Sequence, residues 1–74
     1  MTYLAVDDLG FHLFRNKPSR VEETFKLWKD NTEIPSIDIS RKLYKILCDV
    51  GYISNKNFNY KDEPILIDDI SIFL

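Results

Sequence analysis

The feature that most constrains the fold is an apolar segment that turns back on itself within the first 15 residues. Residues 2–7 and 11–15 are two runs of aliphatic and aromatic side chains, and residues 7–10 (Asp-Asp-Leu-Gly) have the composition of a tight turn. Successive side chains of a strand point to opposite faces, and apolar residues occupy both sets of positions here. The sequence therefore predicts a β-hairpin that is covered on each side, or on one side by the chain and on the other by a partner.

The length of the chain limits what can cover this hairpin. With 74 residues, of which 45% are hydrophobic, the chain can build one small core, and we predict a single domain over residues 1–74. It has only 2 Gly and 3 Pro, so it is neither a linker nor of low complexity. A multidomain enzyme and a deep two-lobed cleft are excluded.

A first helix is predicted after the hairpin, over residues 20–29. Val21, Phe25 and Trp28 recur at the spacing of one helical face. Residues 19–22 (Ser-Arg-Val-Glu) have the spacing of a capping box at its start.

A second helix has a clearer apolar stripe, and a brief strand over residues 33–37 is expected before it. Ser36 or Asp38 can cap the start of this helix, and Gly51 can end it. The stripe consists of Ile39, Leu43, Ile46, Leu47 and Val50, with basic residues opposite.

The C-terminal part predicts further strands. After a loop at residues 54–57, strands are expected over residues 58–60, 65–67 and 70–74, and Pro64 requires an edge position or a bend. The order β-β-α-(β)-α-β-β predicts an α+β fold, in which a small antiparallel sheet of the N-terminal hairpin and C-terminal strands packs with two short helices.

Charge and reactive residues limit the chemistry. The chain has 10 Lys and Arg against 12 Asp and Glu, and a net charge of −2 argues against binding a phosphate backbone over the whole surface. It contains a single Cys, Cys48, and a single His, His12, which excludes an internal disulfide and a zinc site of Cys and His. Cys48 is interpreted as a small core residue rather than a reactive thiol. His12 could act as a general base oriented by Asp7 or Asp8, but no nucleophile accompanies it in a recognisable motif. We expect neither an enzyme nor a cofactor.

The sequence also bears on location. No stretch approaches the roughly 20 apolar residues of a membrane span, and the N-terminus lacks the basic region of a signal peptide. A lone cysteine suits a reducing compartment. We expect a cytoplasmic protein of a bacterial host cell, with no membrane partner.

Three short motifs together resemble a known layout. They are Tyr3-Leu4-Ala5-Val6-Asp7 followed by Gly10, Asn16-Lys17-Pro18-Ser19-Arg20 followed by Trp28, and Asp62-Glu63-Pro64-Ile65. This layout resembles an uncharacterised group of small proteins of phages and gut bacteria, although residues 34–39 depart from it and the tail is longer. The resemblance implies a compact phage or bacterial accessory domain and implies no activity. By association with other small phage proteins, it implies binding and blocking of a host or defence component.

Aromatic and acidic residues are the first candidates for a binding surface. Ten aromatic residues, as 5 Phe, 4 Tyr and 1 Trp, are more than so small a core easily hides, and aromatic residues are enriched at interfaces. The acidic residues near the end match no calcium-loop spacing, so no metal site is predicted there. The expected partner-binding residues are Tyr44, Tyr52, Tyr60, Asp62, Glu63, Asp68 and Asp69.

Basic residues supply the alternative. One group surrounds the Pro18 connector and another lies on the second helix, and beside aromatic rings they would suit a nucleotide or single-stranded nucleic acid. The residues of this alternative are Arg15, Lys17, Arg20, Arg41 and Lys42. The leading hypothesis is a non-enzymatic protein-interaction module that also forms a homo-oligomer.

Overall fold

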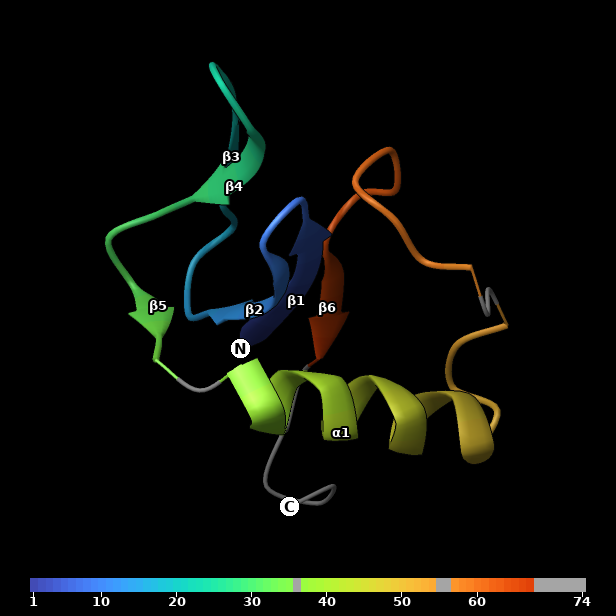
Figure 1. Ribbon diagram of the computed structural model, residues 1–74. Coiled ribbons are helices and arrows are strands. Elements are labelled where there is room, and N and C mark those ends of the chain that lie inside the picture. Colours follow the sequence, from blue (N-terminus) through green and yellow to red (C-terminus); the bar gives the residue numbers. More distant parts are fainter. Residues whose placement is uncertain (36, 55–56, 68–74) are drawn as a thin grey trace.

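The computed structural model describes residues 1–35, 37–54 and 57–67, and within them the chain forms an α+β fold of antiparallel strands and one helix (Figure 1). The elements are β1 (Thr2–Asp7), β2 (Gly10–Phe14), β3 (Ser19–Glu22), β4 (Lys26–Lys29), β5 (Glu33–Ile34), α1 (Ile37–Asp49) and β6 (Ile65–Ile67).

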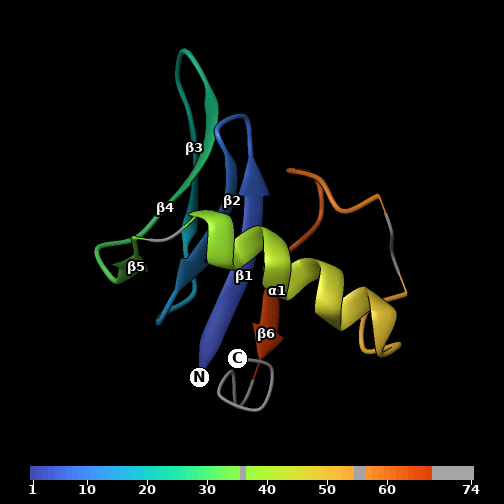
Figure 2. The same cartoon turned by 60° about the horizontal axis from the view of Figure 1, so that its bottom comes forward.

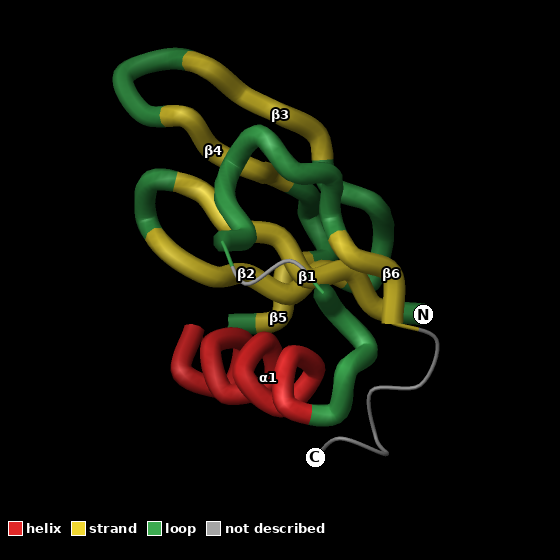
Figure 3. The backbone as a smooth tube through the Cα atoms, turned by 90° about the vertical axis from the view of Figure 1, so that its right-hand side faces the viewer, coloured by secondary structure: helices red, strands yellow, loops and turns green. Residues whose placement is uncertain are grey.

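These elements form three layers. A four-stranded antiparallel sheet of order β5-β2-β1-β6 lies in the middle, and α1 runs across its strands on one side (Figure 2). The separate hairpin β3–β4 lies on the other side of the sheet from α1 (Figure 3). The central hairpin β1–β2 was predicted, and the structure confirms it, with Leu4 opposite Leu13 and Gly10 at a φ of 122° in the turn.

The two apolar faces of the central hairpin are both covered, as the sequence predicts. The core on the α1 side contains Leu4, Leu13, Leu43, Leu47, Ile53 and Ile67, and the core on the other side contains Ala5, Phe14 and Trp28. Full burial of one such large side chain stabilises the fold by about 1.5–3 kcal/mol. Each layer therefore depends on the hairpin between them.

The helix predicted over residues 20–29 is wrong, because this segment is the hairpin β3–β4. Its register places Glu22 opposite Lys26 and Arg20 opposite Trp28. The Arg20 guanidinium lies 4.7 Å from the centre of the Trp28 ring, which is a favourable cation–π contact. Opposite charges directly across strands, as on Glu22 and Lys26, are also favourable. An isolated ten-residue helix is marginal, and these pairs together with the burial of Trp28 favour the strands.

The second predicted helix is confirmed as α1, and it ends at a glycine as predicted. Gly51 has a φ of 79°, its N–H donates to the Cys48 carbonyl, and the N–H of Tyr52 donates to the Leu47 carbonyl. These two bonds are a Schellman motif, which needs a left-handed residue at that position.

The buried stripe of α1 is narrower than the predicted one. Ser40, Leu43 and Leu47 are fully buried, whereas Ile39 and Val50 are 41% and 63% exposed. Residues three and four apart share one face of a helix, and α1 turns the face of Ser40 and Leu43 toward the sheet. Ile39 and Val50 therefore lie outside the face of α1 that contacts the sheet.

The strands predicted in the C-terminal part are confirmed only at residues 65–67, as β6 paired with β1. Residues 58–60 are not a strand, because Asn59 and Asp62 close a turn there through two bonds of 2.9 Å. Residues 70–74 lie outside the described part of the chain. The strand expected over residues 33–37 is the shorter β5, since α1 begins at Ile37.

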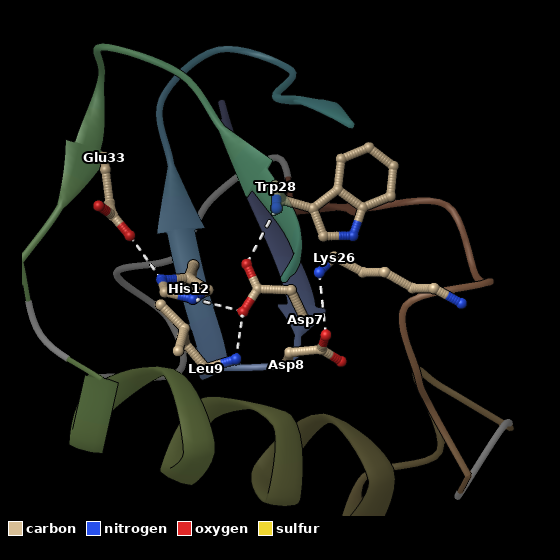
Figure 4. A network of polar contacts seen from close by, with 7 residues as sticks. All are labelled: Asp7, Asp8, Leu9, His12, Lys26, Trp28 and Glu33. Carbon is tan, nitrogen blue, oxygen red and sulfur yellow. Dashed lines mark hydrogen bonds and ion pairs between the residues drawn. The ribbon is translucent and has the colours of Figure 1, made fainter. Parts of the chain in front are cut away.

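One buried carboxylate fixes how the layers meet (Figure 4). The Asp7 side chain is 1% exposed and accepts bonds of 2.9 Å from the backbone N–H groups of Leu9 and Trp28. It also lies 3.0 Å from Nε2 of His12. Neighbouring Asp8 accepts a bond of 2.9 Å from the N–H of Lys26, at the start of β4. Asp7 thus closes the β1–β2 turn and holds β4 against β1.

We predict that Asp7→Ala lowers the free energy of unfolding by about 3 kcal/mol or more, because it leaves buried donors unpaired. Asp8→Ala is the matched control, since its carboxylate accepts one exposed bond, and it should cost about 1 kcal/mol. Urea denaturation of both variants measures the difference. Equal losses would show that Asp7 does not have this role.

Candidate functional site

An open groove of about 420 Å³ lies between α1 and the start of β2. We call it the α1–β2 groove. Phe11, Tyr44 and Cys48 supply its apolar part, and its charged rim consists of Arg41, Lys45 and Asp49. Within the described residues it therefore combines an apolar floor with two cations and one anion.

Helix geometry explains this lining. Arg41, Lys45 and Asp49 are four residues apart, as are Tyr44 and Cys48, so they form two adjacent stripes on α1. The aromatic wall opposite is residue 11, at the start of β2. Two of the lining residues were predicted from the sequence as binding residues: Tyr44 for a protein partner and Arg41 for a nucleic acid. The i, i+4 spacing of the others is visible in the sequence, but the position of the sheet beside them is not.

Tyr44 is the centre of an aromatic row beside the groove. Its ring centre lies 5.1 Å from that of Phe11 and 5.7 Å from that of Phe58. The Tyr44 hydroxyl accepts a bond of 3.4 Å from the N–H of Phe58. Burial raises the pKa of Tyr44, the Phe58 bond opposes this rise, and the nearby Cys48 thiol adds to it. The row holds the floor of the groove in place.

The other predicted partner residues lie elsewhere. Tyr52 is 52% exposed, and its hydroxyl donates to the Leu66 carbonyl at 3.3 Å. Asp62 accepts a bond from the N–H of Asn59, and the Glu63 side chain is 68% exposed. Asp68 and Asp69 lie outside the described residues. Tyr52, Asp62 and Glu63 line one open pocket of about 280 Å³, whereas Tyr44 lines the α1–β2 groove.

Tyr60 belongs to a contact that joins hairpin β3–β4 to the loop before β6. The Arg20 guanidinium lies near the rings of both Trp28 and Tyr60, at 4.7 and 5.3 Å, and donates to the carbonyls of Tyr60 and Lys61. Burial raises the pKa of Tyr60, and the negative charge of Glu22 raises it further. Arg20 and Tyr60 thus have a structural role here.

The predicted basic residues do not form one patch. Arg20 belongs to the β3–β4 layer, whereas Arg41 and Lys42 belong to α1 on the other side of the central sheet (Figure 3). Arg15 and Lys17 lie exposed in the connector from β2 to β3. Among the five, Arg41 lines the groove.

The side chain of His12 connects three strands, because each of its two ring nitrogens has a contact. Its Nε2 lies 3.0 Å from Asp7 and its Nδ1 lies 2.5 Å from Glu33 on β5 (Figure 4). Both ring nitrogens therefore contact carboxylates, one on β1 and one on β5. The His12 side chain thus links β2 to β1 and to β5. In residues 1–35, 37–54 and 57–67, no three His, Cys, Asp or Glu side chains are grouped so as to hold a metal ion.

Comparison with family models, with curated proteins and with solved structures finds no match for this chain. In the described part of the chain, no helix is long and apolar enough to cross a membrane.

We predict that Tyr44 and Tyr60 ionise later than tyrosines of the unfolded chain, whose ordinary pKa is 10.0. Because the folded state then keeps protons that the unfolded state has lost, stability should fall as the pH rises above 10. An alkaline titration of tyrosinate absorbance tests this, and Tyr44→Phe and Tyr60→Phe should each remove a late component. Loss of an early component in either variant would contradict the prediction.

Proposed function

We propose that this chain is a non-enzymatic protein-interaction module that binds a partner in the α1–β2 groove, and that it acts by blocking a host or defence component of a bacterium. The observation that carries the proposal is the groove itself, whose apolar floor lies beside the cations Arg41 and Lys45. Binding sites for side chains usually have an apolar body and few polar groups that fix orientation.

The lining indicates the chemistry of the bound segment. An aromatic side chain fits the floor, because Phe11 and Tyr44 offer ring contacts and the Cys48 sulfur is polarisable. A cavity of about 150 Å³ already holds a benzene molecule. At about 420 Å³ the groove has room for one aromatic ring and part of its backbone. Carboxylates beside that ring would meet Arg41 and Lys45.

A nucleotide or single-stranded nucleic acid is the second candidate. The favouring observation is that Arg41 and Lys45 line the same groove as the aromatic ring of Tyr44, because cations beside aromatic rings are typical of sites for single strands. The separation of the other basic residues from this site favours the protein partner.

We predict that a short blocked peptide with one Phe between two Glu residues binds the groove. Backbone amide shifts in an NMR titration should concentrate on residues 41–49 and on Phe11. Lys45→Glu should weaken binding at least about fivefold by reversing a rim charge, which corresponds to roughly 1 kcal/mol.

Lys42→Glu is the matched control, because Lys42 is exposed on the same helix outside the groove lining. It should change the peptide affinity by less than about twofold. Peptides with Ala for Phe, or Gln for Glu, separate the apolar and charged contributions. If the peptide gives no shifts while oligothymidylate binds with a steep salt dependence, the nucleic-acid candidate replaces the proposed function.

A further inference from the structure

The turn between β3 and β4 carries an aromatic residue that the fold does not use. Glu22 pairs with Lys26, so residues 23–25 (Glu-Thr-Phe) form the turn, and we call residues 22–26 the β3–β4 tip. Phe25 is 51% exposed and belongs to neither core. Tight turns favour Gly, Asn, Asp and Ser, each for a backbone reason that Phe does not share. Aromatic rings are enriched among the residues that contribute most to binding, so this exposed ring is a candidate contact.

The charges around Phe25 complement those around the groove. The tip has two carboxylates, on Glu22 and Glu23, and one ammonium, on Lys26. The groove rim has the reverse set, with two cations and one carboxylate, on Arg41, Lys45 and Asp49. The tip is thus an aromatic ring beside acidic residues, which is the chemistry that the lining of the groove selects.

The tip cannot reach the groove of its own chain. Hairpin β3–β4 projects away from the central sheet on the side opposite α1 (Figures 1 and 3). The groove lies on the α1 side of that sheet. Any contact between them must therefore join two molecules.

We infer that the occupant of the α1–β2 groove is the β3–β4 tip of a second copy of this chain, with the Phe25 ring lying on the apolar floor that Phe11, Tyr44 and Cys48 form. This inference rests on the proposed function, since it names the partner of that same site. Tip and groove are different patches, so each contact is heterologous, and one molecule offers both halves. One hairpin tip buries little surface, which makes the contact weak and dependent on protein concentration.

Complementation between two variants tests the contact. Phe25→Ser removes the ring at the tip and leaves the groove intact, and Arg41→Glu with Lys45→Glu alters the groove rim and leaves the tip intact. All three residues are exposed, so both variants should fold. Light scattering over a concentration range to about 1 mM should show association of the wild-type chain, monomers for each variant alone, and a 1:1 pair when the two are mixed.

Lys17→Glu with Lys42→Glu has the same change in charge on exposed residues outside the groove, and it should associate like the wild-type chain. A wild-type chain that stays monomeric at about 1 mM, or a mixture that does not pair, would overturn the inference. Binding of the Phe–Glu peptide is measured separately. If the peptide binds and the mixture fails, the proposed function stands without the second copy. If the peptide does not bind, the proposed function fails, whatever the oligomeric state.

Discussion

The arrangement of the layers depends on the carboxylate of Asp7, which lies almost fully buried at the end of β1. A buried charge destabilises a fold unless hydrogen bonds replace its water. Here two backbone N–H groups and the imidazole of His12 do so, and they come from the turn, from β4 and from β2. Satisfying one charged group therefore requires three segments to be in place together. In so small a chain this requirement selects one packing of the hairpin β3–β4 among several that hydrophobic burial alone would allow.

A hairpin with two apolar faces also divides the surface of the molecule. Because α1 covers one face and β3–β4 the other, the residues of α1 and those of β3–β4 lie on opposite sides of the central sheet. Arg20 and Tyr60 stabilise one layer through ring and carbonyl contacts. Arg41 and Tyr44 border the groove of the other layer. This separation is why residues that look like one basic or one aromatic group in the sequence have different roles in the structure.

Much of the fold was predictable where the pattern was local. The turn at Gly10 and the end of α1 at Gly51 each follow from backbone conformations within a few residues. The hairpin β3–β4 was not, because Val21, Phe25 and Trp28 have helical spacing. The burial of Trp28 and the bond from its N–H to Asp7, 21 residues away, favour strands and depend on tertiary packing. Only the α1 side of the groove was predictable, because its other side comes from a segment that is distant in the sequence. Its stripe on α1 is in the sequence, but the ring of Phe11 comes from a strand that tertiary packing places beside it.

The limited size of the two cores explains why several aromatic side chains remain in contact with water. The core on the β3–β4 side buries Phe14 and Trp28 almost completely, but Phe11 and Tyr44 are only partly buried beside the open groove on the α1 side. Phe25, in a turn, cannot reach either core without dissolving the hairpin that positions Trp28. Apolar area left in water costs about 25 cal/mol per Å², and association recovers part of that cost wherever two such surfaces have matching shape and charge. In a chain this small, the aromatic residues that exceed the capacity of the core are therefore the ones on which the proposed contact depends.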